Sequence, residues 1–263
     1  MNLDDAFLDH ALQVARQAVD AAAQVIHGHY RSETLGVEHK ADDSPVTRAD
    51  VESEQAIRRV LLGAFPDHAI YGEEEGRRGD SPFLWLVDPI DGTKSFVRSY
   101  PMFSTQVALM VGDELVLGVS CASEFGETAW ARRGGGAFLD GRPVRCATTE
   151  GWNRATLSTG NLKSLATGRG WRQLGELVPK LHRIRGYGDF FHYHLLARGS
   201  IDLVLESDVN ILDIAALTVI VREAGGVFTD LDGQPPGLAT TSVLAGVPDL
   251  HARGLDHFRN WRA

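Results

Sequence analysis

Two apolar segments of the sequence end in acidic residues. The segment 69–71 is followed by Glu73, and the run 83–87 is followed by Asp88 and Asp91. Short apolar runs that stop at glycine or proline are typical of buried strands. Acids that follow such strands would lie at the strand ends, where their oxygens could act as metal ligands or as bases.

Two further acids stand at predicted helix starts. Asp50 begins a helix predicted over 50–64, and Asp213 begins one predicted over 213–224. If the strand ends and helix starts converge, the carboxylates require a counter-charge, because like charges cannot crowd together ionised. A hard divalent cation with oxygen ligands, Mg²⁺ or Mn²⁺, would supply it.

The residues between the two neighbouring aspartates add to this prediction. Pro89 fixes its φ angle and so restricts the turn between Asp88 and Asp91. The backbone carbonyl of Ile90 is a further candidate ligand. Two cations roughly 3.5–4 Å apart could hold the attacking water and the leaving oxygen of an in-line phosphoryl transfer.

A candidate phosphate-binding turn follows directly. Gly92 and Thr93 begin a short predicted helix, and a helix N-terminus presents N–H groups to an anion. The Thr93 hydroxyl could position a water whose proton Asp50 accepts. Each of these motifs alone is also typical of turns, helix caps or solvated loops. Their combination favours a catalytic site.

Composition excludes several classes of protein. The 263 residues carry a formal charge of −9, which disfavours nucleic acids and anionic membranes as partners. Cys121 and Cys146 form neither a CxxC motif nor a disulfide framework. No apolar run approaches membrane-spanning length, and the N-terminus lacks a signal pattern. We expect a cytoplasmic protein.

The elements that must position the acids alternate along the chain. An amphipathic helix is predicted over 5–30, and β-like stretches with hairpin turns at 111–114 and 139–142 occupy 103–146. In the second half we predict strands at 155–159, 183–185, 201–205, 227–228 and 242–245, and helices at 171–179, 189–198, 213–224 and 248–260. This order predicts sheets sandwiched by helices.

Four motifs resemble the inositol monophosphatase family, in the family's order: GEE (72–74), DPIDGT (88–93), LDIAA (212–216) and EAGG (223–226). The resemblance spans nearly the whole chain. It implies an α+β fold, a layered α-β-α-β-α sandwich, as one catalytic unit over 1–263. The N-terminal half of this unit, about 1–150, would bind metal, and the C-terminal half, about 151–263, would recognise the substrate. The family resemblance further implies a Mg²⁺-dependent phosphomonoesterase and favours a homodimer.

The resemblance also implies roles residue by residue. The metal ligands would be Glu73, Asp88, the Ile90 carbonyl, Asp91 and Asp213. Asp50 and Thr93 match the water-activating positions, and Gly92 with Thr93 matches the phosphate-binding turn. These roles coincide with those assigned above from charge and position.

Departures from the family's inositol-directed members bear on the substrate. Leu212 stands where those members usually carry Trp, and Ser95 stands where they usually carry Asn. The stretches 91–98, 183–190 and 200–206 are similar to the histidinol-phosphatase branch. This favours L-histidinol phosphate, a metabolite of histidine biosynthesis. The alternatives are inositol 1-phosphate or another small phosphomonoester, and a metal- or phosphate-binding protein without turnover.

Histidinol phosphate carries an ammonium group and an imidazole that acids would recognise. Glu206 lies at the family's substrate-contacting position, and Asp189 is a second candidate. Arg185 could contact the phosphate, although a helix cap or an exposed ion pair explains Asp189 and Arg185 equally well. His192 and His194 are two residues apart on a predicted helix, so they face different sides and are expected to be structural or on the surface.

Overall fold

Helices and strands alternate in layers, and the computed structural model describes residues 3–30, 38–39 and 45–263. The α-helices are α1 (Asp5–His29), α2 (Arg48–Ala64), α3 (Thr93–Val97), α4 (Arg169–Leu177), α5 (Asp189–Ala197), α6 (Ile211–Glu223) and α7 (Pro248–His257). One sheet contains β3 (Ala69–Gly72), β4 (Gly76–Arg78), β5 (Phe83–Asp91), β6 (Ser104–Val111), β7 (Glu114–Ala122), β8 (Glu127–Arg132), β9 (Gly136–Leu139) and β10 (Arg142–Val144). A second contains β11 (Thr156–Thr159), β12 (Arg183–Arg185), β13 (Leu203–Ser207), β14 (Val227–Thr229) and β15 (Ser242–Gly246). Strands β1 (Glu38–His39) and β2 (Pro45–Val46) pair with each other.

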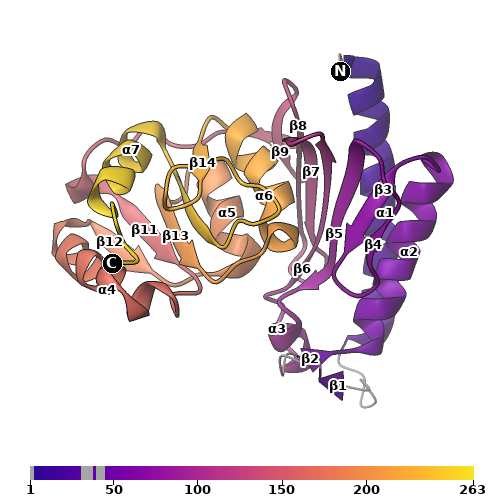
Figure 1. The fold of residues 1–263 in the computed structure, drawn as a ribbon, viewed down its shortest axis with the longest axis horizontal. Coiled ribbons are helices and arrows are strands. Elements are labelled where there is room, and N and C mark those ends of the chain that lie inside the picture. The colour runs from indigo at the N-terminus through magenta and orange to yellow at the C-terminus, as the bar shows by residue number, and fades with distance from the viewer. Residues whose placement is uncertain (1–2, 31–37, 40–44) are drawn as a thin grey trace.

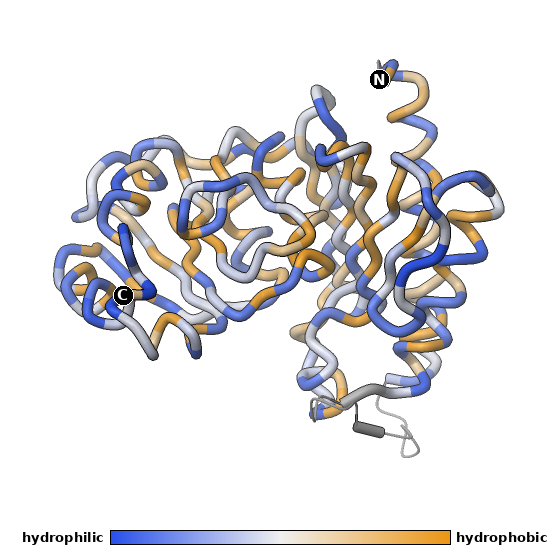
Figure 2. Tube along the Cα trace, viewed as in Figure 1, coloured by the Kyte–Doolittle hydropathy of each residue, from blue (hydrophilic) through white to orange (hydrophobic). Residues whose placement is uncertain are grey.

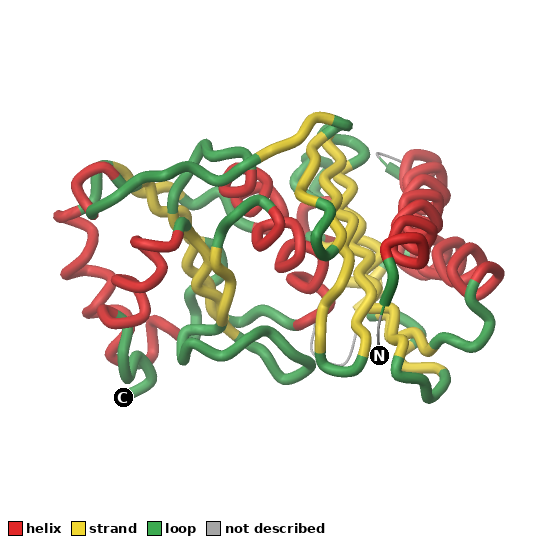
Figure 3. Tube along the Cα trace, turned by 90° about the horizontal axis from the view of Figure 1, so that it is seen from above, coloured by secondary structure: helices red, strands yellow, loops and turns green. Residues whose placement is uncertain are grey.

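The helices cover both faces of both sheets (Figure 1). The eight strands of the larger sheet run in the order β10-β9-β8-β7-β6-β5-β3-β4, and the five of the smaller in the order β12-β11-β13-β15-β14. Helices α1 and α2 pack on one face of the larger sheet, and α5 and α6 fill the space between the sheets. Helices α4 and α7 cover the far face of the smaller sheet, as the view from above also shows (Figure 3). This confirms the layered α-β-α-β-α sandwich.

Burial follows from this layering. Helix α1 turns one apolar stripe toward the larger sheet and begins at Asp4, whose carboxylate accepts the Phe7 N–H at 2.8 Å. Helix α6 lies between two sheets, and nearly all its residues from Ile211 to Val221 are buried. A helix that is apolar on every side is stable only in such a place. Figure 2 shows apolar residues along the central strands and inner helices.

A bulge in β5 replaces the turn expected between Asp88 and Asp91. The strand continues through Asp91, where Asp88 pairs with Gln106 and Asp91 with Ser104 of β6. Asp91 is three residues after Asp88 on β5, whereas their partners on β6 are only two residues apart. The extra residue on β5 makes this a β-bulge. Pro89 fits this position because it has no N–H to donate to a ladder. The bulge brings both carboxylates to one face of the sheet, toward α6.

Most predicted elements are confirmed, with shifted ends. The hairpin turns at 111–114 and 139–142 join β6 to β7 and β9 to β10. The strand predicted over 201–205 is β13, two residues later, and the helices predicted to start at 50 and 213 each start two residues earlier. Within the described part of the chain, no helix combines the length and the apolar character needed to cross a membrane.

Gly118 of β7 sets the approach of α6 to the larger sheet. A Cβ at this position would overlap the backbone of Ala216. We predict that Gly118→Ala lowers the free energy of unfolding by about 1–3 kcal/mol through overpacking, measured by urea denaturation in EDTA. The control is Gly175→Ala in α4, where nothing lies within 4 Å of an added Cβ and stability is expected to hold or rise. Equal stability of both variants would contradict the prediction.

Candidate metal and substrate site

Three aspartates meet between the larger sheet and the inner helices. Asp88 and Asp91 come from the bulge of β5, and Asp213 comes from the first turn of α6. One carboxylate oxygen of each lies within 4.8 Å of the others. Asp88 is buried, with 2% of its surface exposed. The predicted convergence of strand end and helix start therefore holds for these three residues.

Helix α6 fixes Asp213 through a capping box. The Asn210 N–H donates to Asp213 Oδ2 at 3.0 Å, and the Asn210 side-chain amide donates to Asp213 Oδ1 at 2.7 Å. Asn210 Oδ1 in turn accepts the Leu212 N–H at 2.7 Å. These bonds satisfy the helix terminus and hold the carboxylate toward β5.

Glu73 adds a fourth charge from the turn between β3 and β4. Its N–H donates to the Val87 carbonyl at 3.2 Å, which places the turn beside the end of β5. Burial raises the pKa of Asp88 well above its usual range, and the charges of Glu73, Asp91 and Asp213 raise it further. The fourth predicted carboxylate ligand is therefore close enough to repel the other three.

The remaining two acids of the cluster also hold protons more tightly than usual. Burial and the charge of Asp213 raise the pKa of Asp91 well above its usual range. Burial, with the charges of Glu73 and Glu206, raises the pKa of Asp213 to about 7, against hydrogen bonds from Asn210 that lower it. Burial is the main physical cause in each case, and repulsion between the neighbouring carboxylates adds to it.

The donor set fits a hard divalent cation. Among the described residues, no Lys or Arg forms an ion pair with Asp88, Asp91 or Asp213. Carboxylate oxygens that lie this close, with no Lys or Arg paired to them in the described part of the chain, match the ligand preference of Mg²⁺ and Mn²⁺. The Ile90 carbonyl lies in the same bulge and accepts the Thr93 hydroxyl at 3.0 Å.

Asp50 and Thr93 meet beside the cluster from distant parts of the chain. Thr93 Oγ1 lies 3.2 Å from Asp50 Oδ1. Asp50 Oδ2 accepts the Thr47 N–H at 2.7 Å and the Thr47 hydroxyl at 2.6 Å in a capping box of α2. Burial raises the pKa of Asp50, and the charge of Glu73 adds to this, while the bonds from Thr47 and Thr93 lower it. The pair can accept and pass a proton.

Gly92 makes the turn that places Thr93 there. Its φ is +95°, in the left-handed region, and a Cβ would lie 2.7 Å from the Met102 carbonyl oxygen. The short helix α3 begins at the next residue, as predicted. Any other residue at this position would be strained.

A small acid-lined pocket adjoins the cluster. Its polar wall contains Asp91, Asn161, Asp189, Tyr193, Glu206 and Asp213, and its apolar wall contains Val209, Ile214 and Leu217. No basic residue lines it among those the structure describes. Burial and the charge of Glu206 raise the pKa of Asp189 to about 6, although His192 acts to lower it. The pocket is suited to a cationic group.

Glu206 is held rigidly in the wall of this pocket. Its carboxylate accepts the Tyr193 hydroxyl at 2.6 Å and the Asn161 N–H at 3.0 Å, and lies 3.1 Å from His192 Nε2. Burial acts to raise the pKa of Glu206, but His192 and the other hydrogen bonds together hold it below the usual range. Neither His192 nor Tyr193 was predicted as a partner of Glu206, because the packing of α5 against β13 cannot be inferred from either segment alone.

Neither Arg185 nor His194 is among the residues that line this pocket. Arg185 is exposed on β12, and its Nη1 donates to the Ile184 carbonyl at 2.7 Å. His194 is buried on the opposite side of α5 from His192, 2.9 Å from Ser120 Oγ and 3.3 Å from Glu127. The two histidines face different sides, as expected, but neither is on the surface because α5 lies between two sheets.

Comparison with known proteins agrees with this geometry. The sequence profile of the inositol monophosphatase family matches residues 8–262. A histidinol-phosphatase of Streptomyces coelicolor is 37% identical over 89% of each chain. An inositol-1-monophosphatase of Synechocystis is 33% identical, over 91% of this chain and 85% of the relative. The structure of an inositol monophosphatase from Zymomonas mobilis superposes with a TM-score of 0.85 at 30% identity, over 97% of this chain and 99% of the other.

The raised pKa of Asp213 makes the stability of the metal-free protein depend on pH. The unfolded chain releases this proton near pH 4 and the folded chain near pH 7, so the contribution is present below pH 4 and is lost as pH rises through 7. A shift of this size is on the order of 4 kcal/mol. In EDTA, we predict that Asp213→Asn gains stability relative to wild type between pH 5 and pH 8, measured by urea unfolding.

Mg²⁺ provides the control for this experiment. It should stabilise wild type more than Asp213→Asn, because the amide supplies a weaker ligand than the carboxylate. A difference between the two proteins in EDTA that does not vary with pH would contradict the prediction.

Proposed function

Because the chain belongs to the inositol monophosphatase family and is a phosphoric monoester hydrolase, we propose that it hydrolyses L-histidinol phosphate to L-histidinol and phosphate in a Mg²⁺-dependent reaction. Relatives named histidinol-phosphatase, at 32–37% identity, support this substrate. The product would enter histidine biosynthesis.

The acid-lined pocket beside the aspartate cluster carries this proposal. A phosphate ester bound at the cluster would extend its alcohol portion toward Asp189 and Glu206. Histidinol carries an ammonium group and an imidazole, both of which can donate hydrogen bonds to carboxylates. The inositol portion of inositol phosphate is uncharged and would offer no cationic group to Asp189 and Glu206.

Glu73, Asp88, Asp91, Asp213 and the Ile90 carbonyl would hold Mg²⁺. The bound ion would neutralise the carboxylates, lower the pKa of water and polarise the phosphoryl oxygens. The amides of Gly92 and Thr93, where α3 begins, would orient the phosphate.

Thr93 and Asp50 would accept the proton of the attacking water. A water that donates to the Thr93 hydroxyl can lose its proton through that hydroxyl to Asp50, since Thr93 Oγ1 and Asp50 Oδ1 are 3.2 Å apart. The raised pKa of Asp50 makes it a stronger base than an ordinary aspartate. A protein that only bound metal or phosphate would not need this pair.

Three further expectations accompany the proposal. Residues from both halves of the chain line the pocket: Asp91 belongs to the first half, and Asp189, Glu206 and Asp213 belong to the second. This supports a single catalytic unit over 1–263. A homodimer and a cytoplasmic location are also proposed. Light scattering of the purified protein tests the dimer.

The substrate is tested by phosphate release from L-histidinol phosphate and inositol 1-phosphate, side by side, with Mg²⁺ and with EDTA. We expect the higher kcat/KM on histidinol phosphate, and no turnover of either ester in EDTA. A preference for inositol 1-phosphate would reverse the assignment. Activity that is indifferent to EDTA would remove the metal from the proposal.

Asp189→Asn tests the recognition of the cationic group. Loss of one charged hydrogen bond, about 1.5–3 kcal/mol, should lower kcat/KM for histidinol phosphate roughly 10- to 100-fold. The same variant should change kcat/KM for inositol 1-phosphate little, because that ester offers no cation. An equal loss on both esters would show that Asp189 does not select the substrate.

Asp50→Asn tests the proton acceptor. Asparagine can keep the cap on the Thr47 N–H but is not a base, so kcat should fall about 10²- to 10⁴-fold while the fold and the affinity for Mg²⁺ persist. Circular dichroism and calorimetric titration with Mg²⁺ provide the controls. Near wild-type kcat would rule out Asp50 as the base.

A further inference from the structure

Glu54 is a buried carboxylate with no part in the site described so far. It lies on α2, one helical turn after Asp50, and has no exposed surface. Its Oε2 accepts the Glu74 N–H at 2.7 Å and its Oε1 accepts the Glu75 N–H at 3.0 Å. These donors are the two residues directly after Glu73, so the backbone of the Glu73 turn is bound to this one side chain.

Gly72, directly before Glu73, makes room for the same carboxylate. A Cβ on Gly72 would overlap the carboxylate of Glu54. The φ of Gly72 is not in the left-handed region, so space and not backbone conformation requires glycine here. The residues on both sides of Glu73 therefore hold it in place. Gly72 before it leaves room for the Glu54 carboxylate, and the N–H groups of the two residues after it donate to that carboxylate.

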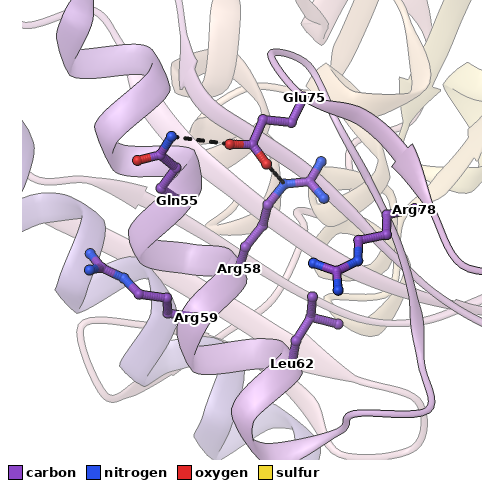
Figure 4. A pocket seen from close by; sticks show the side chains of 6 residues that line it. All are labelled: Gln55, Arg58, Arg59, Leu62, Glu75 and Arg78. Atoms are coloured by element: carbon purple, nitrogen blue, oxygen red, sulfur yellow. Dashed lines mark hydrogen bonds and ion pairs between the residues drawn. The ribbon is translucent and has the colours of Figure 1, made fainter.

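Arg58 holds Glu54 in place and adds an outer contact to the turn. Its Nε donates to Glu54 Oε1 at 2.8 Å, and its Nη2 donates to the Gly76 carbonyl at 2.6 Å. Figure 4 shows the outer contact, in which Glu75 lies 3.4 Å from Arg58 Nε and accepts Gln55 Nε2 at 3.2 Å. The buried charge of Glu54 is thus paired and fully hydrogen-bonded, as a buried carboxylate must be.

We propose that Glu54 is the positioning residue for Glu73, and that α2 thereby fixes the metal ligand relative to the base. Residues four apart on a helix share a face, so Asp50 and Glu54 project from α2 toward the same region. Asp50 reaches Thr93 directly, and Glu54 reaches Glu73 through the turn. The proposal rests on the role of Glu73 as a metal ligand in the proposed function.

Glu54→Gln tests the proposal. Glutamine keeps the shape of the side chain but has one oxygen for two N–H donors. We expect the Kd for Mg²⁺, from calorimetric titration with MgCl₂, to rise about 10- to 100-fold, as when other supports of metal ligands are lost. The Mg²⁺ concentration for half-maximal phosphate release should rise in parallel, while kcat at saturating Mg²⁺ falls far less. A residue that only stabilises the fold would lower the unfolding midpoint and leave this Kd unchanged.

Glu52→Gln is the matched control. Glu52 lies on the same helix but its carboxylate contacts His29 and Arg48, not the turn. We expect an unchanged Kd for Mg²⁺. A folded Glu54→Gln protein with the wild-type Kd overturns the proposal. If Glu54→Gln does not fold, Glu54→Asp decides, because it keeps the charge beside Arg58 but is too short to reach both N–H groups, and an unchanged Kd in that variant overturns the proposal equally.

Glu73→Gln separates this inference from the proposed function. If Glu73→Gln weakens Mg²⁺ binding and Glu54→Gln does not, only the role of Glu54 fails. If Glu73→Gln itself binds Mg²⁺ like wild type, the assignment of Glu73 as a ligand fails, and the role of Glu54 fails with it.

Discussion

Repulsion among buried carboxylates is the constraint on which the rest of this structure depends. Asp88, Asp91 and Asp213 lie within a few ångströms of one another, and the charge of Glu73 acts on all three. Such an arrangement persists only if the backbone holds each acid in place. The bulge in β5 holds Asp88 and Asp91, and the capping box of α6 holds Asp213. The turn that carries Glu73 is held by its backbone hydrogen bonds to the Glu54 carboxylate.

The two acidic regions of the site differ in electrostatic environment. In the cluster, burial and the neighbouring charges raise the pKa values of Asp88 and Asp91, so protons or a cation are required there. Glu206, in the wall of the same pocket, has its pKa lowered by His192 and by hydrogen bonds from Tyr193 and the Asn161 N–H, so it stays ionised. One region is therefore suited to a multivalent metal and the other to an organic cation, within a single pocket between the sheets.

Local patterns predicted the acids and the layers, but not the contacts that place them. Asp50 and Asp213 were predicted to begin their helices, whereas each lies in the first turn, in a capping box with a polar residue three positions earlier. Asp88 and Asp91 lie close together, as predicted, but in a bulge and not in the expected turn, since the pairing of β5 with β6 is not a local property. Glu54 resembles any helical acid with an arginine four residues on, so its contact with the turn after Glu73 could not be inferred from the sequence. The role of Arg185 stays a prediction, and its strand β12 lies at the edge of the smaller sheet.

The bulge in β5 has a consequence for what the DPIDG sequence encodes. Along a regular strand, side chains separated by an odd number of steps project in opposite directions. Asp88 and Asp91 are three steps apart, and the inserted position restores their common direction. If β5 ran through this three-residue interval as a regular strand, without the bulge, one of the two carboxylates would project into the layer beneath α1 and α2. The bulge is therefore as necessary to the site as the two aspartates themselves.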